Sequence, residues 1–542
     1  MKLNLDSLKK RQIWEEKGYK LPQFDVQKVR EKTLKEPVWI HFGAGNIFRA
    51  FLASLQQNLL NKGLSDKGII ACAPYDDEVI KKVYLPYENL SILVTLKEDG
   101  EIEKSVIASI VSALSVKENM DEIERIFISP SLQIASFTIT EKGYALENAK
   151  GEYFQEVLSD IDNFPEKPKS VMGTIAYLCY KRYLAGELPL ALVSMDNIAH
   201  NGTKLYEAVK FFAEKWMEKG KVEKGFLDYL CDSKMVSFPW SMIDKITPRP
   251  SEKVMDLLKA DGLEDVKIYK TGKNTYVSCF VNAEPTEYLV IEDNFPNGRP
   301  PLEEAGVFFT DRETVEKAEK MKVCTCLNPL HTVLAIFGCL LNYSFIYEEM
   351  RDENLKALVE KIGYEEGLPT VINPGIINPE DFIKEVIEKR LPNPFVPDTP
   401  QRIACDTSQK IPVRFGETLK AYVRLNKDLK SLTYIPLFFA GWLRYLMGID
   451  DEGKEFIPSP DPMLTELQRH IKKISLGEKG PFTEFLKPIL SDEKIFGINL
   501  YDYGLASKVE QMFEKLVSGV GAVRRTLKEF TELGVNANEN GI

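Results

Sequence analysis

The chain has 542 residues, of which 28% are charged, and its formal net charge is −11 at pH 7. This length can bury large cores and predicts about two to four domains. The acidic balance argues against a nucleic-acid-binding protein, which needs a basic face. It leaves room for an anionic small substrate, because a few local Lys and Arg residues can hold one.

The N-terminal segment 1–20 has no apolar signal-peptide core and predicts a polar helix. No run of about 18 apolar residues follows, so we expect no membrane span and a cytoplasmic protein. Several of the eight cysteines lie within apolar runs. In a chain of this length they favour reduced, buried thiols over a disulfide framework.

The first half of the chain alternates apolar strand-like runs with helical stretches, which indicates a mostly parallel sheet. Residues 38–42 predict a buried strand, and 49–63 follow with helical spacing and a terminal glycine. The series continues with strands at 68–74, 91–96, 132–140 and 188–196, and with a helix near 168–184.

The second half has a different character. Residues 273–310 combine short strands with Pro/Gly turns and close the first domain. The expected fold class is α/β, with a Rossmann-type, doubly wound domain at 1–311 followed by a mostly α-helical domain at 312–542. Helical patterns in the second domain cover 313–320, 329–349, 353–362, 378–390, 416–428, 434–448, 462–474 and 505–531.

A dinucleotide site is predicted where the first strand meets its helix. Gly43 and Gly45 allow a tight turn there, and a helix N-terminus favours a pyrophosphate. Phe48 stands where the usual fingerprint has a third glycine, so a plain strand-to-helix turn is the alternative. Asp76 or Asp77, after the second strand, would bind ribose hydroxyls and favour NAD over NADP. Either could instead be a solvated loop residue.

The segment "KVCTCLNPLH" (322–331) allows three interpretations: a metal knuckle, a proton-handling site, or the start of a buried helix. Cys324, Cys326 and His331 offer three zinc ligands, whereas structural zinc sites usually show four in two close pairs. No second pair lies nearby in the sequence, and the other histidines are scattered. We therefore expect no metal.

The backbone of this segment is constrained by Pro329, which biases Asn328 away from the α region. Asn is a favoured N-cap and Pro is favoured at the first helical position, so a helix is expected to start at Asn328. Residues 322–327 would then lie outside it. Asn328 could be only a cap, but capping leaves its NH₂ group able to donate to a ligand.

Lys322 is the unusual member of the segment, because it lies among apolar residues next to a domain boundary. Desolvation lowers a lysine pKa from about 10.4. A lysine brought near about 7–8 can act as a general base, as an alcohol dehydrogenase without zinc requires. Carboxamide donors nearby could hold the developing alkoxide.

Six segments, in order, resemble the polyol-specific long-chain dehydrogenase family, whose members include mannitol dehydrogenases and hexuronate reductases. The resemblance runs from about residue 38 to beyond 450. The segments are "IHFGAGNIFRAF" (40–51), "SFTITEKGY" (136–144), "SMDNIAHNG" (194–202), "FPWSMIDKITP" (238–248), "NPLH" (328–331) and "RIACDTSQKIPVR" (402–414).

The resemblance implies a Rossmann domain, a mostly helical domain, NAD(P) as cofactor and catalysis without metal. It implies that Lys322 is the general acid/base, that Asn328 polarises the substrate carbonyl and that Glu319 relays protons. One departure concerns spacing: the five residues "VCTCL" separate Lys322 from Asn328, one more than in the family pattern, and a local bulge could absorb the extra residue. The implied catalytic set is Lys322, Asn328, His331, Asn197, Glu319 and Asp244. The implied cofactor-binding set is Gly43, Gly45, Asn46, Ile47, Phe48, Arg49, Asp76, Thr140, Glu141 and Asn197.

Within the family, residues 281–311 and the N-terminal extension look closest to hexuronate reductases of the fructuronate type, which interconvert D-fructuronate and D-mannonate with NAD. A substrate carboxylate needs a cation, and Arg can bind one with two hydrogen bonds. Each candidate cation could instead form an ion pair or be solvated. The expected substrate-binding set is Asn328, His331, Asn393, Arg402, Lys410 and Arg414, although an Asn-Pro turn explains Asn393 equally well.

Other functions remain open from the sequence. Within the family, the alternatives are a mannitol 2-dehydrogenase and a tagaturonate reductase; outside it, a non-catalytic NAD-binding regulator or a zinc-dependent hydrolase. The expected partner is a small sugar acid or polyol, with no nucleic acid and no membrane, and the expected state is a monomer or small homo-oligomer.

Overall fold

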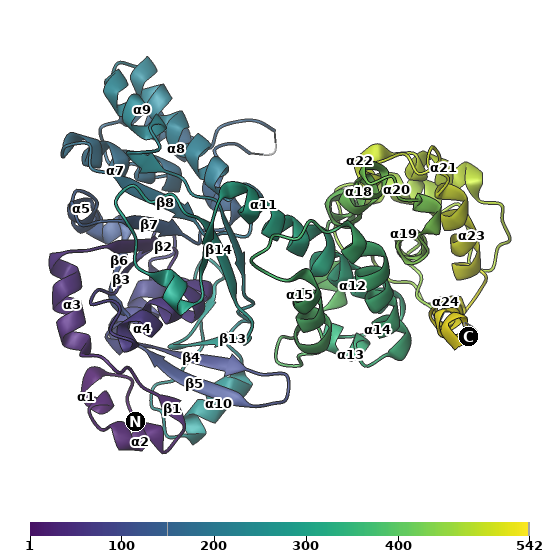
Figure 1. The fold of residues 1–542 in the computed structure, drawn as a ribbon, viewed down its shortest axis with the longest axis horizontal. Coiled ribbons are helices and arrows are strands. Elements are labelled where there is room, and N and C mark those ends of the chain that lie inside the picture. Colours follow the sequence, from purple (N-terminus) through teal and green to yellow (C-terminus); the bar gives the residue numbers. More distant parts are fainter. Residues whose placement is uncertain (149, 540–542) are drawn as a thin grey trace. The chain divides into compact units, whose positions relative to one another are not determined.

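The computed structural model describes residues 1–148 and 150–539. They form two compact units, 1–316 and 317–542. The first contains the sheets, and the second is built from helices (Figure 1). The sequence places a boundary at 311/312, whereas the two units divide within helix α11 (Arg312–Met321).

The first unit is centred on six parallel strands in the order β6-β3-β2-β7-β8-β9. This is the strand order of a Rossmann fold, in which the direction of winding reverses between the first and fourth strands, here β2 and β7. The predicted fold class is confirmed. The strands are β2 (Trp39–Phe42), β3 (Ile69–Ala73), β6 (Ile110–Ser115), β7 (Ile134–Phe137), β8 (Leu190–Ser194) and β9 (Val236–Ser237).

Both faces of this sheet are buried, as the continuous apolar runs require. Ile40 and Phe42 join one core, and their neighbour Trp39 joins the other, because alternate side chains point to opposite faces. Arg182 on α7 is fully buried and donates to carbonyls including those of Leu132 and Pro189. The first core contains α5 (Val116–Phe127), α7 (Val171–Leu184), α8 (Asn201–Glu218) and α9 (Lys224–Cys231); the second contains η1 (Phe48–Leu52) and α4 (Ala53–Asn61).

Smaller sheets complete the unit. The expectation that 91–96 continues the central series was wrong: β4 (Ser91–Leu96) pairs antiparallel with β5 (Ile102–Ile107). The short connection between these strands allows a hairpin, and β6 takes the third place in the central sheet. The N-terminus holds two short helices, α1 (Leu5–Leu8) and α2 (Arg11–Glu15), where one was expected. The other short elements are β1 (Tyr19–Lys20), α3 (Val26–Lys35), η2 (Ile80–Tyr84), η3 (Leu85–Tyr87), η4 (Glu141–Tyr144), α6 (Gln155–Asn163), β10 (Ser241–Asp244), α10 (Glu252–Ala260), β11 (Tyr269–Lys270), β12 (Tyr276–Val277), β13 (Phe280–Ala283), β14 (Tyr288–Glu292), η5 (Leu302–Ala305) and β15 (Phe308–Thr310).

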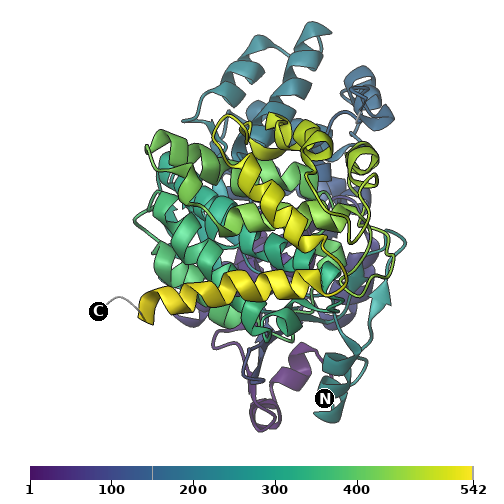
Figure 2. The same cartoon turned by 90° about the vertical axis from the view of Figure 1, so that its right-hand side faces the viewer.

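The second unit follows the predicted helical pattern closely, although the helical stretches expected at 329–349 and at 505–531 are each divided in two. The long C-terminal helix α24 (Ala522–Glu539), yellow in Figure 2, packs against α14 and α23. The remaining elements are η6 (Lys322–Cys326), α12 (Asn328–Leu340), α13 (Ile346–Glu349), α14 (Glu353–Glu360), η7 (Lys361–Gly367), η8 (Leu368–Thr370), α15 (Pro379–Glu385), η9 (Val386–Arg390), α16 (Pro400–Ile403), α17 (Thr407–Ile411), η10 (Pro412–Gly416), α18 (Glu417–Arg424), η11 (Leu429–Ser431), α19 (Tyr434–Leu446), α20 (Leu464–Ile471), α21 (Thr483–Leu490), α22 (Glu493–Phe496) and α23 (Ala506–Leu516).

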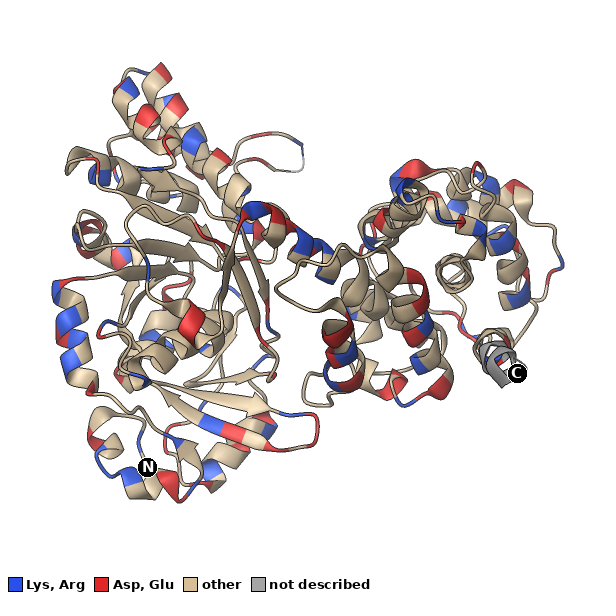
Figure 3. Cartoon of the chain, in the orientation of Figure 1, with Lys and Arg blue, Asp and Glu red and all other residues tan. Residues whose placement is uncertain are grey.

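One helical stretch within the described ranges, Arg312–Leu340, has the length and hydropathy of a membrane span. Its most apolar window is 78% buried inside the structure, as expected of a core helix. Basic and acidic residues are interspersed along the helices of both units (Figure 3).

Candidate active site

The turn after β2 requires a glycine at its first position. Gly43 has φ +124°, and a β-carbon there would lie 2.2 Å from the carbonyl oxygen of Thr138, at the end of β7. A β-carbon at Gly45 would meet no atom within 4 Å. The turn therefore lies at the point where the sheet reverses its winding. It is closely packed at Gly43 and open at Gly45. This arrangement fits a dinucleotide pyrophosphate.

Phe48, which replaces the third glycine, packs beneath this turn. Its ring stacks on His41 of β2 at a centroid distance of 4.3 Å. The two ring nitrogens of His41 lie 2.7 Å from Ser136 Oγ and 2.8 Å from Thr138 Oγ1. Burial lowers the pKa of His41 to about 3, so the ring is neutral. Sequence reasoning passed over His41, although it lies two residues before Gly43.

Arg49 and Asn46 join the turn to a distant segment. The fully buried Arg49 guanidinium donates to the Ser278 carbonyl at 2.6 Å and to Asn46 Oδ1 at 2.9 Å. Ile47 precedes the π-helical turn η1. The Arg49 side chain thus holds the turn against the segment that enters β13.

The two candidate ribose-binding acids have different surroundings. Asp76 accepts a hydrogen bond of 2.6 Å from the Thr271 hydroxyl, which belongs to the β11–β12 hairpin. Asp77 pairs with Lys81 at 3.2 Å, and this hydrogen bond lowers the pKa of its carboxyl. Asp76 thus meets a neutral hydroxyl and Asp77 meets a cation, so Asp76 is the better candidate of the two for ribose.

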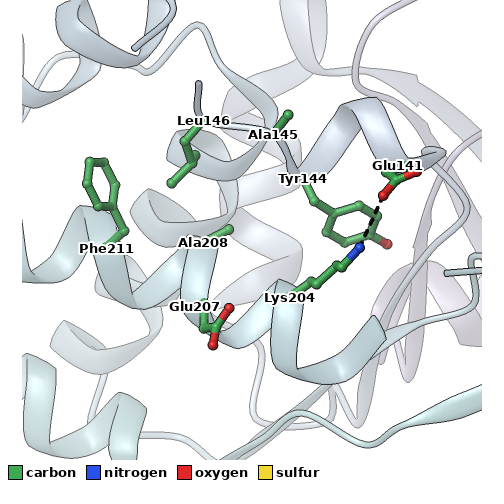
Figure 4. Close-up of a pocket in the computed structure, with 8 residues that line it drawn as sticks. All are labelled: Glu141, Tyr144, Ala145, Leu146, Lys204, Glu207, Ala208 and Phe211. Carbon is green, nitrogen blue, oxygen red and sulfur yellow. Dashed lines mark hydrogen bonds and ion pairs between the residues drawn. The ribbon is translucent and has the colours of Figure 1, made fainter. Parts of the chain in front are cut away.

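The loop after β7 contains the predicted residues Thr140 and Glu141. Glu141 pairs with Lys204 of α8 at 3.1 Å, and both line a pocket of about 420 Å³ (Figure 4). Thr140 has φ +63° and ψ 165°, and its amide donates to Asp196 Oδ1 at 2.8 Å. Asp196 was not singled out in the sequence, although it lies within the "SMDN" motif.

Two predicted catalytic residues also belong to the first unit. Asn197 is exposed and directly follows Asp196 beyond the end of β8. Asp244 is the last residue of β10, is buried, and pairs in register with Tyr288 of β14. Both lie within the motif segments quoted above, 194–202 and 238–248.

In the second unit, Lys322 begins a π-helical turn that continues helix α11 and precedes helix α12. Residues Lys322–Cys326 form the π-helical turn η6, and the Leu327 amide donates to the Lys322 carbonyl at 3.1 Å. The expectation that 322–327 lies outside the helix starting at Asn328 is confirmed, but 322–326 are themselves helical, which the sequence did not predict. Helix α12 does begin at Asn328, but as its first helical residue, with Leu327 in the N-cap position and no side-chain cap. A turn with i to i+5 bonds is one residue wider than an α-turn, which accommodates the additional residue.

The side chains around this turn are mostly buried. Lys322 is 1% exposed, and Glu319 lies about one turn earlier on α11. Burial raises the pKa of Cys324 and of Cys326 to about 12, so both are neutral thiols. All eight cysteines are unpaired. Within 1–148 and 150–539, no three His, Cys, Asp or Glu side chains are grouped as metal ligands.

Arg414 holds the first turn of α12. Its guanidinium donates to the Asn328 carbonyl at 3.2 Å and to the Thr332 hydroxyl at 2.5 Å. Burial lowers the pKa of Arg414 to about 10, so it stays protonated at neutral pH. The Arg414 side chain therefore helps to fix the position of the Asn328 backbone.

His331 lies in the same turn, with Nε2 3.5 Å from Asp398 Oδ2. Burial lowers the pKa of His331 to about 4, which makes the ring neutral near pH 7. Both oxygens of Asp398 also accept hydrogen bonds from Arg402. Arg402 is thus engaged by a carboxylate of the chain itself, a role of Asp398 that the sequence did not suggest.

The ammonium of Lys410, on α17, donates to the Ile403 carbonyl at 2.8 Å. Burial, followed by the nearby Arg414, lowers its pKa to about 8. Asn393 is buried, and its Oδ1 accepts the Phe395 amide at 2.9 Å, as in a simple turn.

Comparison with known families identifies this combination of domains. The mannitol dehydrogenase Rossmann domain matches residues 38–304, and the mannitol dehydrogenase C-terminal domain matches 314–517. The chain belongs to the mannitol dehydrogenase family. The resemblance seen in the six segments is confirmed, and membership makes the chain an oxidoreductase.

Relatives cover the chain almost completely. D-mannonate oxidoreductase of Thermotoga maritima is 55% identical over 535 residues, which are 98% of this chain and 99% of that protein. The Pseudomonas fluorescens mannitol 2-dehydrogenase, solved as a ternary complex with NAD and D-mannitol, has a TM-score of 0.70 at 26% identity. It covers 98% of this chain and 100% of its own. A substrate-free D-sorbitol dehydrogenase has a TM-score of 0.75 at 25% identity, with 93% and 97% covered.

Proposed function

We propose that this member of the mannitol dehydrogenase family interconverts D-fructuronate and D-mannonate with NAD. The observation that carries the proposal is the 55% identity, over almost the full length of both chains, to a D-mannonate oxidoreductase. More distant relatives that act on polyols are near 30% identity or below.

The residues of the first unit fit NAD. Gly43 and Gly45 would hold its pyrophosphate, and Asp76 would accept hydrogen bonds from ribose hydroxyls and disfavour the additional phosphate of NADP. When bound, NADH supplies the hydride that reduces the keto carbon. Asn46, Ile47, Phe48, Arg49, Thr140 and Glu141 stay predictions as further cofactor-binding residues.

The residues of the second unit fit proton transfer. In the reductive direction, the Lys322 ammonium donates a proton to the substrate oxygen and becomes a neutral amine, which Glu319 helps to reprotonate from solvent. The Asn328 amide donates a hydrogen bond to the same oxygen, which stabilises the alkoxide as it forms. Arg414 and Thr332 fix the backbone of Asn328 beforehand. Asn197, as a second donor, and Asp244 stay predictions of the same kind.

Recognition of a sugar acid needs a cation for its carboxylate. Lys410 fits this role better than Arg402 or Arg414. Its ammonium donates to a neutral carbonyl, that of Ile403, whereas Arg402 pairs with a carboxylate and Arg414 holds the first turn of α12. His331 and Asn393 remain candidates for sugar hydroxyls. Independence of metal, a cytoplasmic location and a monomeric or small oligomeric state stay predictions.

The test is a substrate panel with NADH absorbance as the readout, using D-fructuronate, D-tagaturonate, D-fructose and fructose 6-phosphate. The proposal expects the highest kcat/KM with fructuronate, and a lower value with NADPH than with NADH. Best turnover with fructose would overturn the hexuronate assignment. NADH binding without turnover of any sugar would instead indicate a regulator.

A further inference from the structure

The loop after β7 contains a residue in a conformation that its type avoids. Thr140 has φ +63° and ψ 165° and is β-branched. This region of backbone space is accessible mainly to glycine, and other residues occupy it only where their surroundings hold them. The contacts of Thr140 should therefore show what holds it.

Those contacts converge on one buried carboxylate. Asp196 Oδ1 accepts the Thr140 amide at 2.8 Å, and Oδ2 accepts the Ile139 amide at 2.9 Å and the Tyr144 hydroxyl at 2.6 Å. Asp196 is 8% exposed and lies two residues beyond the end of β8, the strand next to β7. Three donors on one carboxylate thus fix both the strained residue and the helical turn that follows it.

Asp196 is itself fixed from the other side. The Asn201 side-chain amide donates to the Asp196 carbonyl at 3.1 Å and to the Ser241 carbonyl at 2.9 Å. The Tyr144 hydroxyl also lies 2.7 Å from Ser194 Oγ. Tyr144 lines the same pocket as the Glu141–Lys204 pair (Figure 4). Three of the six motif segments, 136–144, 194–202 and 238–248, are therefore joined in one hydrogen-bond network.

This network reaches the dinucleotide turn directly. Thr138, two residues before Thr140, donates from its hydroxyl to the Gly43 carbonyl at 3.3 Å, and its own carbonyl is the atom that excludes a side chain at Gly43. A change in the course of the loop at Thr140 would therefore alter the surface beside Gly43. In sheets of this type, ligands bind outside the carboxyl ends of the strands at this point.

We propose that Asp196 is a positioning residue for the cofactor: by holding Thr140 in its strained conformation, it keeps the loop after β7 in the shape that binds NAD. The inference rests on the proposed use of NAD. It does not depend on which sugar is reduced.

The test measures NADH affinity by fluorescence titration in the absence of sugar, together with the thermal midpoint. Asp196→Asn keeps the size of the side chain but places an NH₂ group against backbone donors. Its NADH Kd should rise about tenfold or more, since the strained loop is no longer held. Adding Thr140→Gly should restore most of the affinity, because glycine adopts positive φ without a steric cost.

A matched control is available in the same unit. Asp160 is also a buried carboxylate that accepts two backbone amides, those of Lys169 and Ser170, each at 2.8 Å. Asp160→Asn should lower the thermal midpoint and leave NADH affinity unchanged. A purely structural role of Asp196 would make the two variants behave alike and would give no rescue by Thr140→Gly.

Clear outcomes contradict the inference. Wild-type NADH affinity in Asp196→Asn, or a loss of affinity that Thr140→Gly does not restore, would overturn it. If Asp196→Asn does not fold, Tyr144→Phe removes one of the three donors while keeping the ring. It should weaken NADH binding in the same direction, with the same rescue, and unchanged affinity would count against the inference. If the wild-type protein binds no NADH, the proposed cofactor is wrong. This result differs from a failure of the positioning role, in which the wild-type protein binds NADH and the variants bind it equally well.

Discussion

Lys322 combines nearly complete burial with a position in a wide helical turn. If it transfers the proton, Lys322→Ala should reduce kcat by a factor on the order of 10²–10⁴ while NADH still binds. The check is NADH oxidation at saturating substrate alongside a fluorescence titration. Lys320→Ala, at an exposed position of the same helix, is the control and should keep its rate. A near-normal rate in Lys322→Ala would assign the proton transfer to another group.

The ammonium of Lys410 is predicted to bind the substrate carboxylate only while it is charged. Its pKa of about 8 means that the cation is present below pH 8 and is lost as the pH rises through that value. KM for fructuronate should therefore increase above pH 8, and KM for a neutral ketose should not. Lys410→Arg should keep KM low at pH 9, since guanidinium stays protonated.

A second variant separates charge from general damage. Lys410→Met should raise KM for fructuronate by about tenfold or more, the scale of a lost charged hydrogen bond, with little effect on a neutral ketose. Lys420→Met, which removes an exposed lysine paired with Glu417, is the control. An equal effect on both substrates would remove Lys410 from carboxylate recognition.

The preference for NAD should depend on Asp76 and not on its neighbour. Asp76→Asn should lower the ratio of kcat/KM for NAD to that for NADP by about tenfold, because the charge that disfavours the additional phosphate is lost. Asp77 is occupied by Lys81, so Asp77→Asn should leave the ratio unchanged. If Asp77→Asn changes the ratio more, the two assignments must be exchanged.

At the scale of elements, the packing of α13 on α12 buries a carboxyl group without a partner. Both oxygens of Glu349 are buried and make no hydrogen bond in the structure, and a β-carbon at Gly338 would lie 2.1 Å from one of them. Burial raises the pKa of Glu349 well above its usual value. Folding therefore binds a proton at Glu349. The stability that this protonation contributes is present in full below about pH 4 and is lost progressively as the pH rises.

Glu349→Gln should remove this pH dependence, because the amide has the same shape and does not ionise. The free energy of unfolding should increase more at pH 8 than at pH 5, because only the wild-type protein loses the stability linked to the bound proton as the pH rises. Urea denaturation of the two proteins at both pH values provides the measurement. An equal change at both pH values would show that the proton linkage lies elsewhere.

Among the elements, helices with local sequence signals could be predicted, whereas contacts between distant segments could not. Helical spacing and flanking residues predicted most helices of the second unit, because those signals are local. The turn η6 was missed, since Pro329 indicated a helix start and gave no sign that α11 continues into it. The contacts of Asp196, Asp398 and Thr271 join segments distant in sequence, and no local pattern contains them.

At the scale of the whole molecule, alternation of apolar runs and helices was enough to predict a Rossmann-type unit and a helical unit. It could not assign each strand to its sheet. Residues 91–96 have the composition of a central strand, yet they pair with 102–107 and with β13, far along the chain. Pairing depends on which edges meet in space, whereas composition reports only burial.

The wide turn η6 also bears on how such a site can change through insertion rather than substitution. Each residue added to an α-helix rotates everything after it by about 100°, which would turn the buried face of α12 toward the wrong neighbours. A turn with i to i+5 bonds contains the added residue, so α12 keeps the same face toward the core. The helix before the turn, which leads to the lysine, is rotated about its axis instead. The spacing between a reactive lysine and an asparagine can then differ between relatives by single-residue steps without repacking of the helical core.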